Sequence, residues 1–213
     1  MGIEVLGSIF TIQDGTFQIL LMKNTKEPYK GYWILPCEVI KDDKTVEESI
    51  EKIVSEKFGF SDLKYDQCHV FSDLDRVPGK RMVGISLMSI VDEGTVMTKK
   101  IDTEYEIEWF PIDNLPKIGY DHIRVIEKSI EVLKEKVVQS KMLQQIFPCD
   151  FTLPEIQKVY EQLLSKNLDR RNFRKKFISL DLIEETGDKA PVSTGRPAKL
   201  YRFKEDVDNV LLF

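Results

Sequence analysis

The fold of the first part of the chain is decided by residues 31–60, which read GYWILPCEVIKDDKTVEESIEKIVSEKFGF. Apolar residues in this stretch recur at the spacing of one helix face over residues 45–58. They are Val46, Ile50, Ile53, Val54 and Phe58. Gly59 follows directly and is typical of a helix C-terminus, because glycine readily adopts the left-handed conformation found there. The stretch therefore predicts a helix that buries one face.

The sequence on either side of this helix predicts a mixed α/β unit. On the N-terminal side, β-rich runs at residues 3–12 and 17–23 flank Asp14-Gly15, a dipeptide typical of hairpin turns. Asp121 is placed to cap a further helix over residues 122–137. Three more runs on the C-terminal side have strand composition: residues 67–71, 82–91 and 105–110. We expect these elements to form a domain over residues 1–138.

The rest of the chain, residues 139–213, has the pattern of short helices followed by a hairpin. A short helix is expected at 140–147, a second after the capping box Thr152–Glu155, and a third at 169–180. Two β-rich runs at 182–185 and 199–203 enclose a loop rich in glycine, proline, serine and threonine. This order is the layout of a winged helix-turn-helix domain, which is mostly α-helical.

The third of these helices begins with residues 169–176, DRRNFRKK, and is strongly basic. If Phe173 and Phe177 face the core, the side chains left outside can bind phosphates or base edges of double-stranded DNA. The candidate DNA-binding residues on the helix are Arg170, Arg171, Asn172, Arg174, Lys175 and Lys176. Arg196, Lys199 and Arg202 lie on the following loop and hairpin. The alternative is an ordinary solvated face, but the position after the helical turn favours DNA binding.

The net charge of the chain is −5, yet it is divided unevenly. Residues 141–213 hold 13 lysines and arginines against 11 acids, a net charge of +2, so the remaining residues carry −7. Within 166–204 the counts are 11 and 5, a net charge of +6. An acidic first part and a basic second part indicate two kinds of partner.

The composition narrows the class of protein. The chain has 213 residues, of which 42% are hydrophobic and 31% charged, as in one large or two modest globular domains. Three cysteines indicate a reducing, cytoplasmic setting, and two histidines exclude a His-rich metal site. Neither a membrane-spanning run nor a secretory signal is recognisable. We therefore expect a cytoplasmic protein without a membrane partner.

Residues 31–60 resemble the box of the Nudix superfamily, G-x5-E-x7-R-E-U-x-E-E-x-G-U, where U is aliphatic. Aligned on Gly59-Phe60, the chain has Glu38 at the motif glycine, Lys44 at its first glutamate, and KIVSEK at residues 52–57 in place of R-E-U-x-E-E. Nudix hydrolases use the box glutamates to hold divalent cations. Of the three helical glutamates only Glu56 remains, with Ile53 and Lys57 at the other two positions. The resemblance thus implies no catalytic residue, no metal site and no cofactor.

Other charged residues of the helix leave two questions open. Glu47, Glu48 and Glu51 are possible substitute ligands, although a solvated role, with Glu48–Lys52 as an i,i+4 pair, is favoured. Lys57 or Lys52 either supplies fixed positive charge to a ligand phosphate or is a plain surface lysine. A ligand affinity independent of EDTA would support the first role.

Together the two parts resemble the Nudix-related transcriptional regulators, a bacterial family. The resemblance also rests on Gln67–Asp73 (QCHVFSD) and on the runs LDRRNFRK and GRPAKLYRF, at residues 168–175 and 195–203. It implies a homodimer that binds a palindromic operator, as repressor or activator, and controls genes of NAD or sugar metabolism. The effector is expected to be ADP-ribose, a related nucleotide or a sugar.

The effector pocket is assigned by position in the resemblance. Candidate effector-binding residues are Trp33, Lys57, Arg76, Arg81, Tyr120 and His122. Trp33 can stack on a base, and the arginines can grip phosphate or a hydroxyl. Each also has a structural interpretation: Trp33 and Tyr120 as core, and Asp121-His122 as the cap of the following helix.

Two other functions remain compatible with the sequence. The first is an active Nudix hydrolase of a nucleoside diphosphate derivative with an accessory nucleic-acid-binding domain. The second is an adaptor whose basic helix binds an acidic protein. Phosphate-release assays discriminate the first, and gel shifts with Arg171→Ala discriminate the second.

Overall fold

The computed structural model describes residues 1–13, 15–92, 105–137, 144, 147, 150–190 and 197–204. The chain separates into two compact units, one of residues 1–11 and 18–132, the other of residues 12–17 and 133–213. The predicted domain boundary between residues 138 and 139 lies outside the described residues, so it stays a prediction. No described helix is long and apolar enough to cross a membrane.

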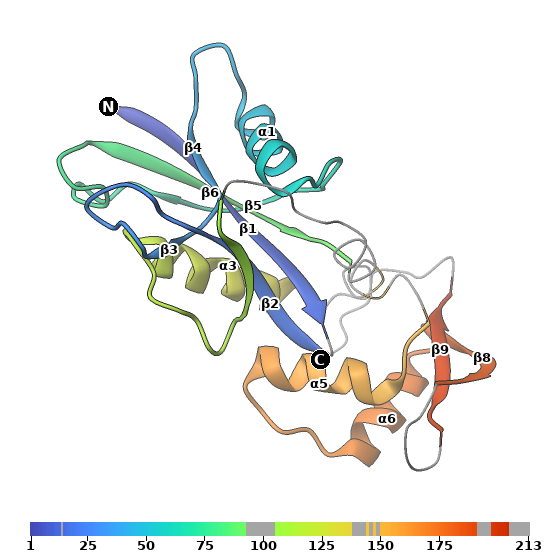
Figure 1. The fold of residues 1–213 in the computed structure, drawn as a ribbon. Coiled ribbons are helices and arrows are strands. Elements are labelled where there is room, and N and C mark those ends of the chain that lie inside the picture. Colours follow the sequence, from blue (N-terminus) through green and yellow to red (C-terminus); the bar gives the residue numbers. More distant parts are fainter. Residues whose placement is uncertain are drawn as a thin grey trace. The chain divides into compact units, whose positions relative to one another are not determined.

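The first unit is built on a seven-stranded mixed sheet (Figure 1). Its strands are β1 (Gly2–Gln13), β2 (Thr16–Lys23), β3 (Trp33–Ile34), β4 (Cys37–Val39), β5 (Asp66–Phe71), β6 (Met82–Ile90) and β7 (Ile107–Pro111). The main path runs β3-β2-β1-β6-β5, with β4 paired to β1 and β7 to β2. β1 and β6 are parallel, and the other strand pairs described in register are antiparallel.

All five predicted strands are confirmed with shifts of one or two residues at their ends. β3 and β4, of 2 and 3 residues, were not predicted, because an alternating pattern cannot be recognised over so short a run. The hairpin residue Asp14 lies outside the described residues. Gly15 has φ +66°, the left-handed conformation that favoured glycine in this turn.

One face of the sheet is covered by helix α1 (Val46–Phe58). The helix begins at a capping box in which Thr45 and Glu48 each bond the other's backbone N–H, and it ends at Gly59 with φ +70°. Its predicted stripe, apart from the half-buried Val46, is buried in one core with residues from β1 and β2, among them Val5, Ile9 and Leu20. Gly7 lies between Val5 and Ile9, and a Cβ there would come within 2.7 Å of Ile50 Cδ1. The missing side chain lets α1 pack closely on β1.

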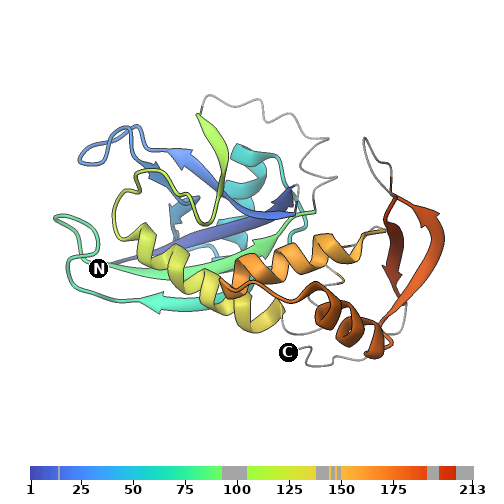
Figure 2. The same ribbon diagram turned by 90° about the horizontal axis from the view of Figure 1, so that it is seen from below.

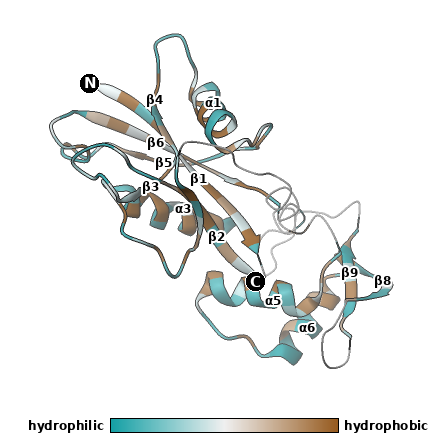
Figure 3. Cartoon of the chain, in the orientation of Figure 1, coloured by the Kyte–Doolittle hydropathy of each residue, from teal (hydrophilic) through white to brown (hydrophobic). Residues whose placement is uncertain are grey.

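The opposite face is covered by helix α3 (His122–Val137), as Figures 1 and 2 show. Val125, Ile126 and Leu133 are fully buried. The hydroxyl of Ser8 on β1 donates to the hydroxyl of Ser129 on α3 at 2.9 Å. In Figure 3 hydrophobic colour is prominent on the strands, whereas the helices carry both colours. The predicted helix at 122–137 is therefore confirmed, and the part of it that belongs to the first unit packs on the sheet.

The second unit contains α5 (Leu153–Leu164), α6 (Arg170–Ser179) and the hairpin of β8 (Ile183–Lys189) and β9 (Lys199–Phe203). Both predicted N-caps are confirmed: Thr152 forms its capping box with Glu155, and Asp169 accepts the Asn172 N–H at 2.8 Å. β8 extends four residues beyond the predicted strand, past an irregularity between Glu185 and Lys189. The predicted helix at 140–147 lies almost entirely outside the described residues.

The core of the second unit holds the helices in the winged-helix layout. Phe173 and Phe177 are buried and their rings stack at 5.5 Å, while Tyr160 of α5 packs on Phe173 at 5.8 Å. The backbone of Phe151 pairs with Tyr201 of β9, which ties the hairpin to the start of α5. The fold is thus an α/β Nudix-like unit followed by a winged helix, as predicted.

Candidate functional site

A pocket of about 510 Å³ opens in the first unit beside the last turns of α1. β1 contributes Glu4 to its wall, and α1 contributes Lys52, Ile53, Glu56 and Lys57. The loop after β2 adds residues 24–26, and β4 adds Cys37 and its two neighbours. The pocket therefore lies where the degenerate box faces the sheet.

The charges that line this pocket are mostly positive. Five lysines and three glutamates line it: Lys23, Lys26, Lys52, Lys57, Lys80, Glu4, Glu38 and Glu56. Lys52 is held between Glu38 at 3.3 Å and Glu56 at 3.9 Å. Lys23 pairs with Glu106 at 2.8 Å. Glu38 and Glu56, the carboxylates at box positions in this pocket, are thus both paired with Lys52.

The box residues do not fit the divalent cation that Nudix chemistry implies. Mg²⁺ takes oxygen ligands, but Ile53 offers hydrocarbon and Lys57 a positive charge at two of the helical positions. The third, Glu56, is 62% exposed and pairs with Lys52. Among the described residues no group of three His, Cys, Asp or Glu side chains is arranged to hold a metal ion.

The glutamates considered as substitute ligands have structural roles. Glu48 closes the capping box at Thr45, so the expected Glu48–Lys52 pair is wrong: Lys52 turns to Glu38 and Glu56 instead. Glu51 accepts the Asp62 N–H at 3.0 Å and the Tyr65 hydroxyl at 3.2 Å. Burial and the nearby Glu51 carboxylate raise the pKa of Tyr65, which keeps this donor protonated.

His122 and Tyr120 lie together at the rim where α3 begins. His122 is 2% exposed, and its Nδ1 accepts the Leu35 N–H at 3.1 Å. Burial, with a smaller contribution from Arg76, lowers the pKa of His122 to about 3, so the ring is neutral. Tyr120 has φ +55°, and its ring packs on Tyr29 at 4.6 Å. The hydrogen bond of His122 ties the start of α3 to Leu35, and His122 also lines the pocket. Asp121 was expected to cap α3, but both of its carboxylate oxygens accept from Arg76 instead.

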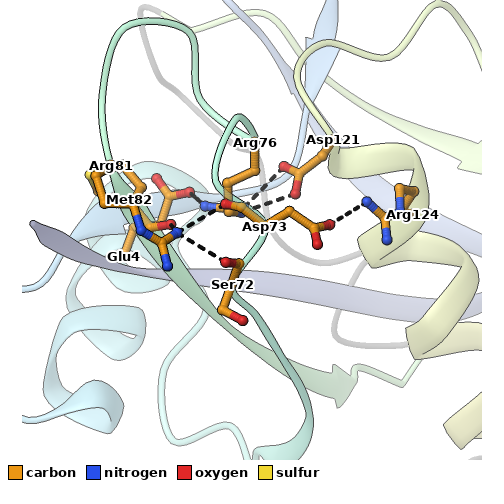
Figure 4. Close-up of polar contacts among 8 residues, drawn as sticks. All are labelled: Glu4, Ser72, Asp73, Arg76, Arg81, Met82, Asp121 and Arg124. Carbon is orange, nitrogen blue, oxygen red and sulfur yellow. Dashed lines mark hydrogen bonds and ion pairs between the residues drawn. The ribbon is translucent and has the colours of Figure 1, made fainter.

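Arg76 is buried in a network with the carboxylates of Glu4 and Asp121, which Figure 4 shows. Its guanidinium donates to both oxygens of Asp121, at 2.9 and 3.0 Å, and to Glu4. The Arg76 side chain is fully buried, whereas Glu4 lines the pocket. A Cβ at Gly84 would lie 2.8 Å from Cζ of Arg76, so the glycine makes room for the guanidinium. The network joins a pocket residue to the residue that precedes α3.

Arg81 and Trp33 lie away from the pocket wall. Arg81 donates to the backbone oxygens of Ser72 and Asp73, both at 3.0 Å. The Trp33 ring is 9% exposed and packs edge-on to Phe110 at 4.7 Å.

The fold thus brings together Lys57, Tyr120 and His122 of the six candidates. Arg76 reaches the pocket only through Glu4. Two lining residues that matter for its charge, Glu4 and Lys26, were missed. Glu4 could have been found, because it is a single carboxylate at the start of an otherwise apolar strand. Nothing in the sequence of the loop after β2 singles out Lys26.

The basic face of the second unit is exposed as predicted. All six predicted residues of α6 are exposed: Arg170, Arg171, Asn172, Arg174, Lys175 and Lys176. On the hairpin, Lys199 pairs with Glu185 at 2.8 Å and Arg202 with Asp150 at 3.3 Å, which reduces the net charge they offer. Arg196 lies outside the described residues. α6 therefore carries the main cationic surface of the described part of this unit.

Two family models match the chain over both parts. The NUDIX domain matches residues 7–128, more than half of the chain, and the NrtR DNA-binding winged helix domain matches residues 144–203. The chain belongs to the NUDIX family and carries an NrtR-type winged helix domain.

Three similar proteins match between about half and nearly all of this chain. The ADPR responsive transcriptional repressor NtrR of Acinetobacter baylyi is 27% identical over 200 residues, covering 92% of this chain and 79% of the relative. The crystal structure of Shewanella oneidensis NrtR complexed with a 27mer DNA superposes with a TM-score of 0.76 and 26% identity, covering 95% and 93% of the two chains. An ADP-ribose pyrophosphatase of Methanocaldococcus jannaschii is 32% identical over 110 residues, 52% of this chain and 64% of the relative.

Proposed function

We propose that this chain is an ADP-ribose-responsive transcriptional repressor, in which the NUDIX unit binds the effector and the winged helix binds operator DNA. The observation that carries the proposal is the similarity to DNA-bound NrtR, which extends over 95% of this chain rather than one domain. The repressor of A. baylyi, described as ADPR responsive, is similar over 92%. Both parts of the chain are thus accounted for by one function.

The basic face of α6 is the proposed reader of DNA. Asp169 caps a helix whose outward residues include five cations and Asn172, while Phe173 and Phe177 hold the opposite side in the core. Arginine can bind guanine with two hydrogen bonds, asparagine can do the same to adenine, and lysine suits backbone phosphates. Because one such helix reads one half-site, we expect a homodimer on a palindromic operator.

A gel shift with DNA from upstream of the chain's own gene tests this function. We expect a shifted complex whose amount changes when ADP-ribose is added, and Arg171→Ala should weaken it. Lys64→Ala is the control, because it removes one exposed positive charge from the first unit. An unchanged shift with Arg171→Ala, or a complex indifferent to ADP-ribose, would contradict the respective part of the proposal.

The same proposal excludes hydrolysis as the main activity. Ile53, Lys57 and the Lys52-bound Glu56 leave the box without a set of free carboxylates for a divalent cation. The second candidate function, ADP-ribose hydrolysis, is favoured by the similarity to the pyrophosphatase of M. jannaschii. Release of AMP from ADP-ribose with Mg²⁺ decides between them. Turnover comparable to an intact Nudix enzyme would replace the repressor-only proposal.

Effector binding is proposed to act through α3. His122 at its start lines the pocket, Asp121 just before it binds Arg76, and its last five residues belong to the second unit. A ligand can shift an equilibrium only by the difference in its affinity for the two states. Structures of the operator-bound and effector-bound dimers test this, since an identical separation of the two α6 helices would reject it.

A further inference from the structure

We propose that Lys57 takes the place of the divalent cation in the NUDIX pocket, so that the diphosphate of the effector is bound by a charge of the chain itself. The inference rests on the proposed function. It adds the residue that binds the diphosphate and the expectation that binding needs no metal ion. The ligand class is a diphosphate ester that is bound and not cleaved.

The position of Lys57 is the first reason. It stands where the box has its last glutamate, on the last turn of α1, and it lines the pocket. In a Nudix hydrolase the carboxylate at this position contributes to binding a cation that neutralises the substrate diphosphate. Here the carboxylate is exchanged for an ammonium group, so the site has positive charge without metal.

The ion pairs distinguish Lys57 from Lys52, the other lysine that α1 contributes to the pocket. Lys52 is shared by Glu38 and Glu56 at 3.3 and 3.9 Å, so its charge is neutralised locally. Lys57, by contrast, forms no ion pair with another residue in the described part of the chain. Its ammonium instead lies 4.6 Å from the centre of the Tyr105 ring, another pocket residue. This contact restrains the side chain but leaves its charge uncompensated.

A second lysine converges on the same region. Lys26 and Lys57 both act electrostatically on the Cys37 thiol in the pocket wall. Burial, then Glu4, raises the pKa of Cys37 to about 12, and Lys57, Arg76 and Lys26 oppose that rise. Within the described residues Lys26 likewise lacks an ion-pair partner. Lys26 and Lys57 therefore both add positive charge to the wall of the pocket.

Calorimetric titration of the full-length chain with ADP-ribose, in EDTA and in Mg²⁺, tests the assignment. Wild-type affinity should be the same in both buffers. Lys57→Met keeps most of the length of the side chain, and removing its charge should weaken binding roughly ten- to a hundredfold. Lys57→Arg should stay close to wild type. Lys64→Met is the matched control, because Lys64 is exposed and does not line the pocket.

A carboxylate at this position gives the reciprocal experiment. Lys57→Glu should bind poorly in EDTA, and Mg²⁺ should restore part of the affinity, since the new carboxylate lies one residue from Glu56. Wild-type binding that requires Mg²⁺, or a Lys57→Met affinity equal to that of the Lys64→Met control, would overturn the inference while leaving the effector in place. A wild-type chain that binds ADP-ribose in neither buffer overturns both the inference and the proposed effector.

Discussion

Loss of the Arg76 side chain should be strongly destabilising. It is fully buried between Glu4 and Asp121, whose side chains are only 12% and 10% exposed. Arg76→Met would leave two carboxylates without a counter-charge, so we expect a loss of about 3–5 kcal/mol in the free energy of unfolding. Urea denaturation measures it, with Arg81→Met as control at about 1 kcal/mol. Similar losses in the two variants would contradict this role of the network.

His122 gives the protein a specific pH dependence. Burial lowers its pKa in the folded state from 6.5 to about 3, so between these values only the unfolded chain binds the proton. Stability is therefore present above pH 6.5 and is lost as the pH falls toward 3. From pH 8 to pH 5 this group alone should cost about 2 kcal/mol.

The variant that isolates this effect is His122→Asn, whose side-chain oxygen can still accept the Leu35 N–H. Its unfolding free energy should fall less steeply than that of the wild type over the same range, by about 2 kcal/mol. Parallel curves for the two proteins would show that His122 is protonated in the folded state as well.

Among the helices, α1 depends on Gly59 for the place at which it ends. The residue has φ +70°, and an added Cβ would meet no atom within 4 Å. Gly59→Ala should therefore cost about 1–2 kcal/mol through backbone strain alone. Ser61→Ala, at an exposed position nearby, should change stability by less than about 0.5 kcal/mol. Thermal unfolding compares them, and an equal effect would exclude a specific role of the helix end.

Elements with a local signal could be predicted from the sequence. α1, α5 and α6 have an apolar stripe and a capping residue within one short stretch, and the structure confirms all three. The two-residue strand β3 has no such pattern, and its place depends on pairing with the preceding strand β2 across the loop between them. The position of Lys57 in the pocket was predictable from the box spacing. That Lys52 is ion-paired while Lys57 is not could not be predicted, because the pair of Lys52 depends on Glu38, 14 residues away in sequence.

For the chain as a whole, the net charge of −5 conceals the two surfaces on which its function depends. The DNA-binding candidate α6 is cationic, and so is the pocket, although the first part of the sequence is acidic. Both proposed partners are polyanions, an operator and a diphosphate. Their attraction is therefore local to each site, and DNA affinity should fall with salt. Lys175→Ala should reduce the slope of log affinity against log salt by about one.

The two proposed sites are far apart in sequence, so the decisive property is the coupling between them. If ADP-ribose changes the affinity for operator DNA by some factor, operator DNA must change the affinity for ADP-ribose by the same factor. We expect the two ratios to agree when each dissociation constant is measured with and without a saturating amount of the other ligand. Asp121→Asn should bring both ratios closer to one, because it weakens the link between Glu4 in the pocket and the start of α3. An ADP-ribose affinity that is identical for the free and the operator-bound protein would mean that the pocket and the reader act independently.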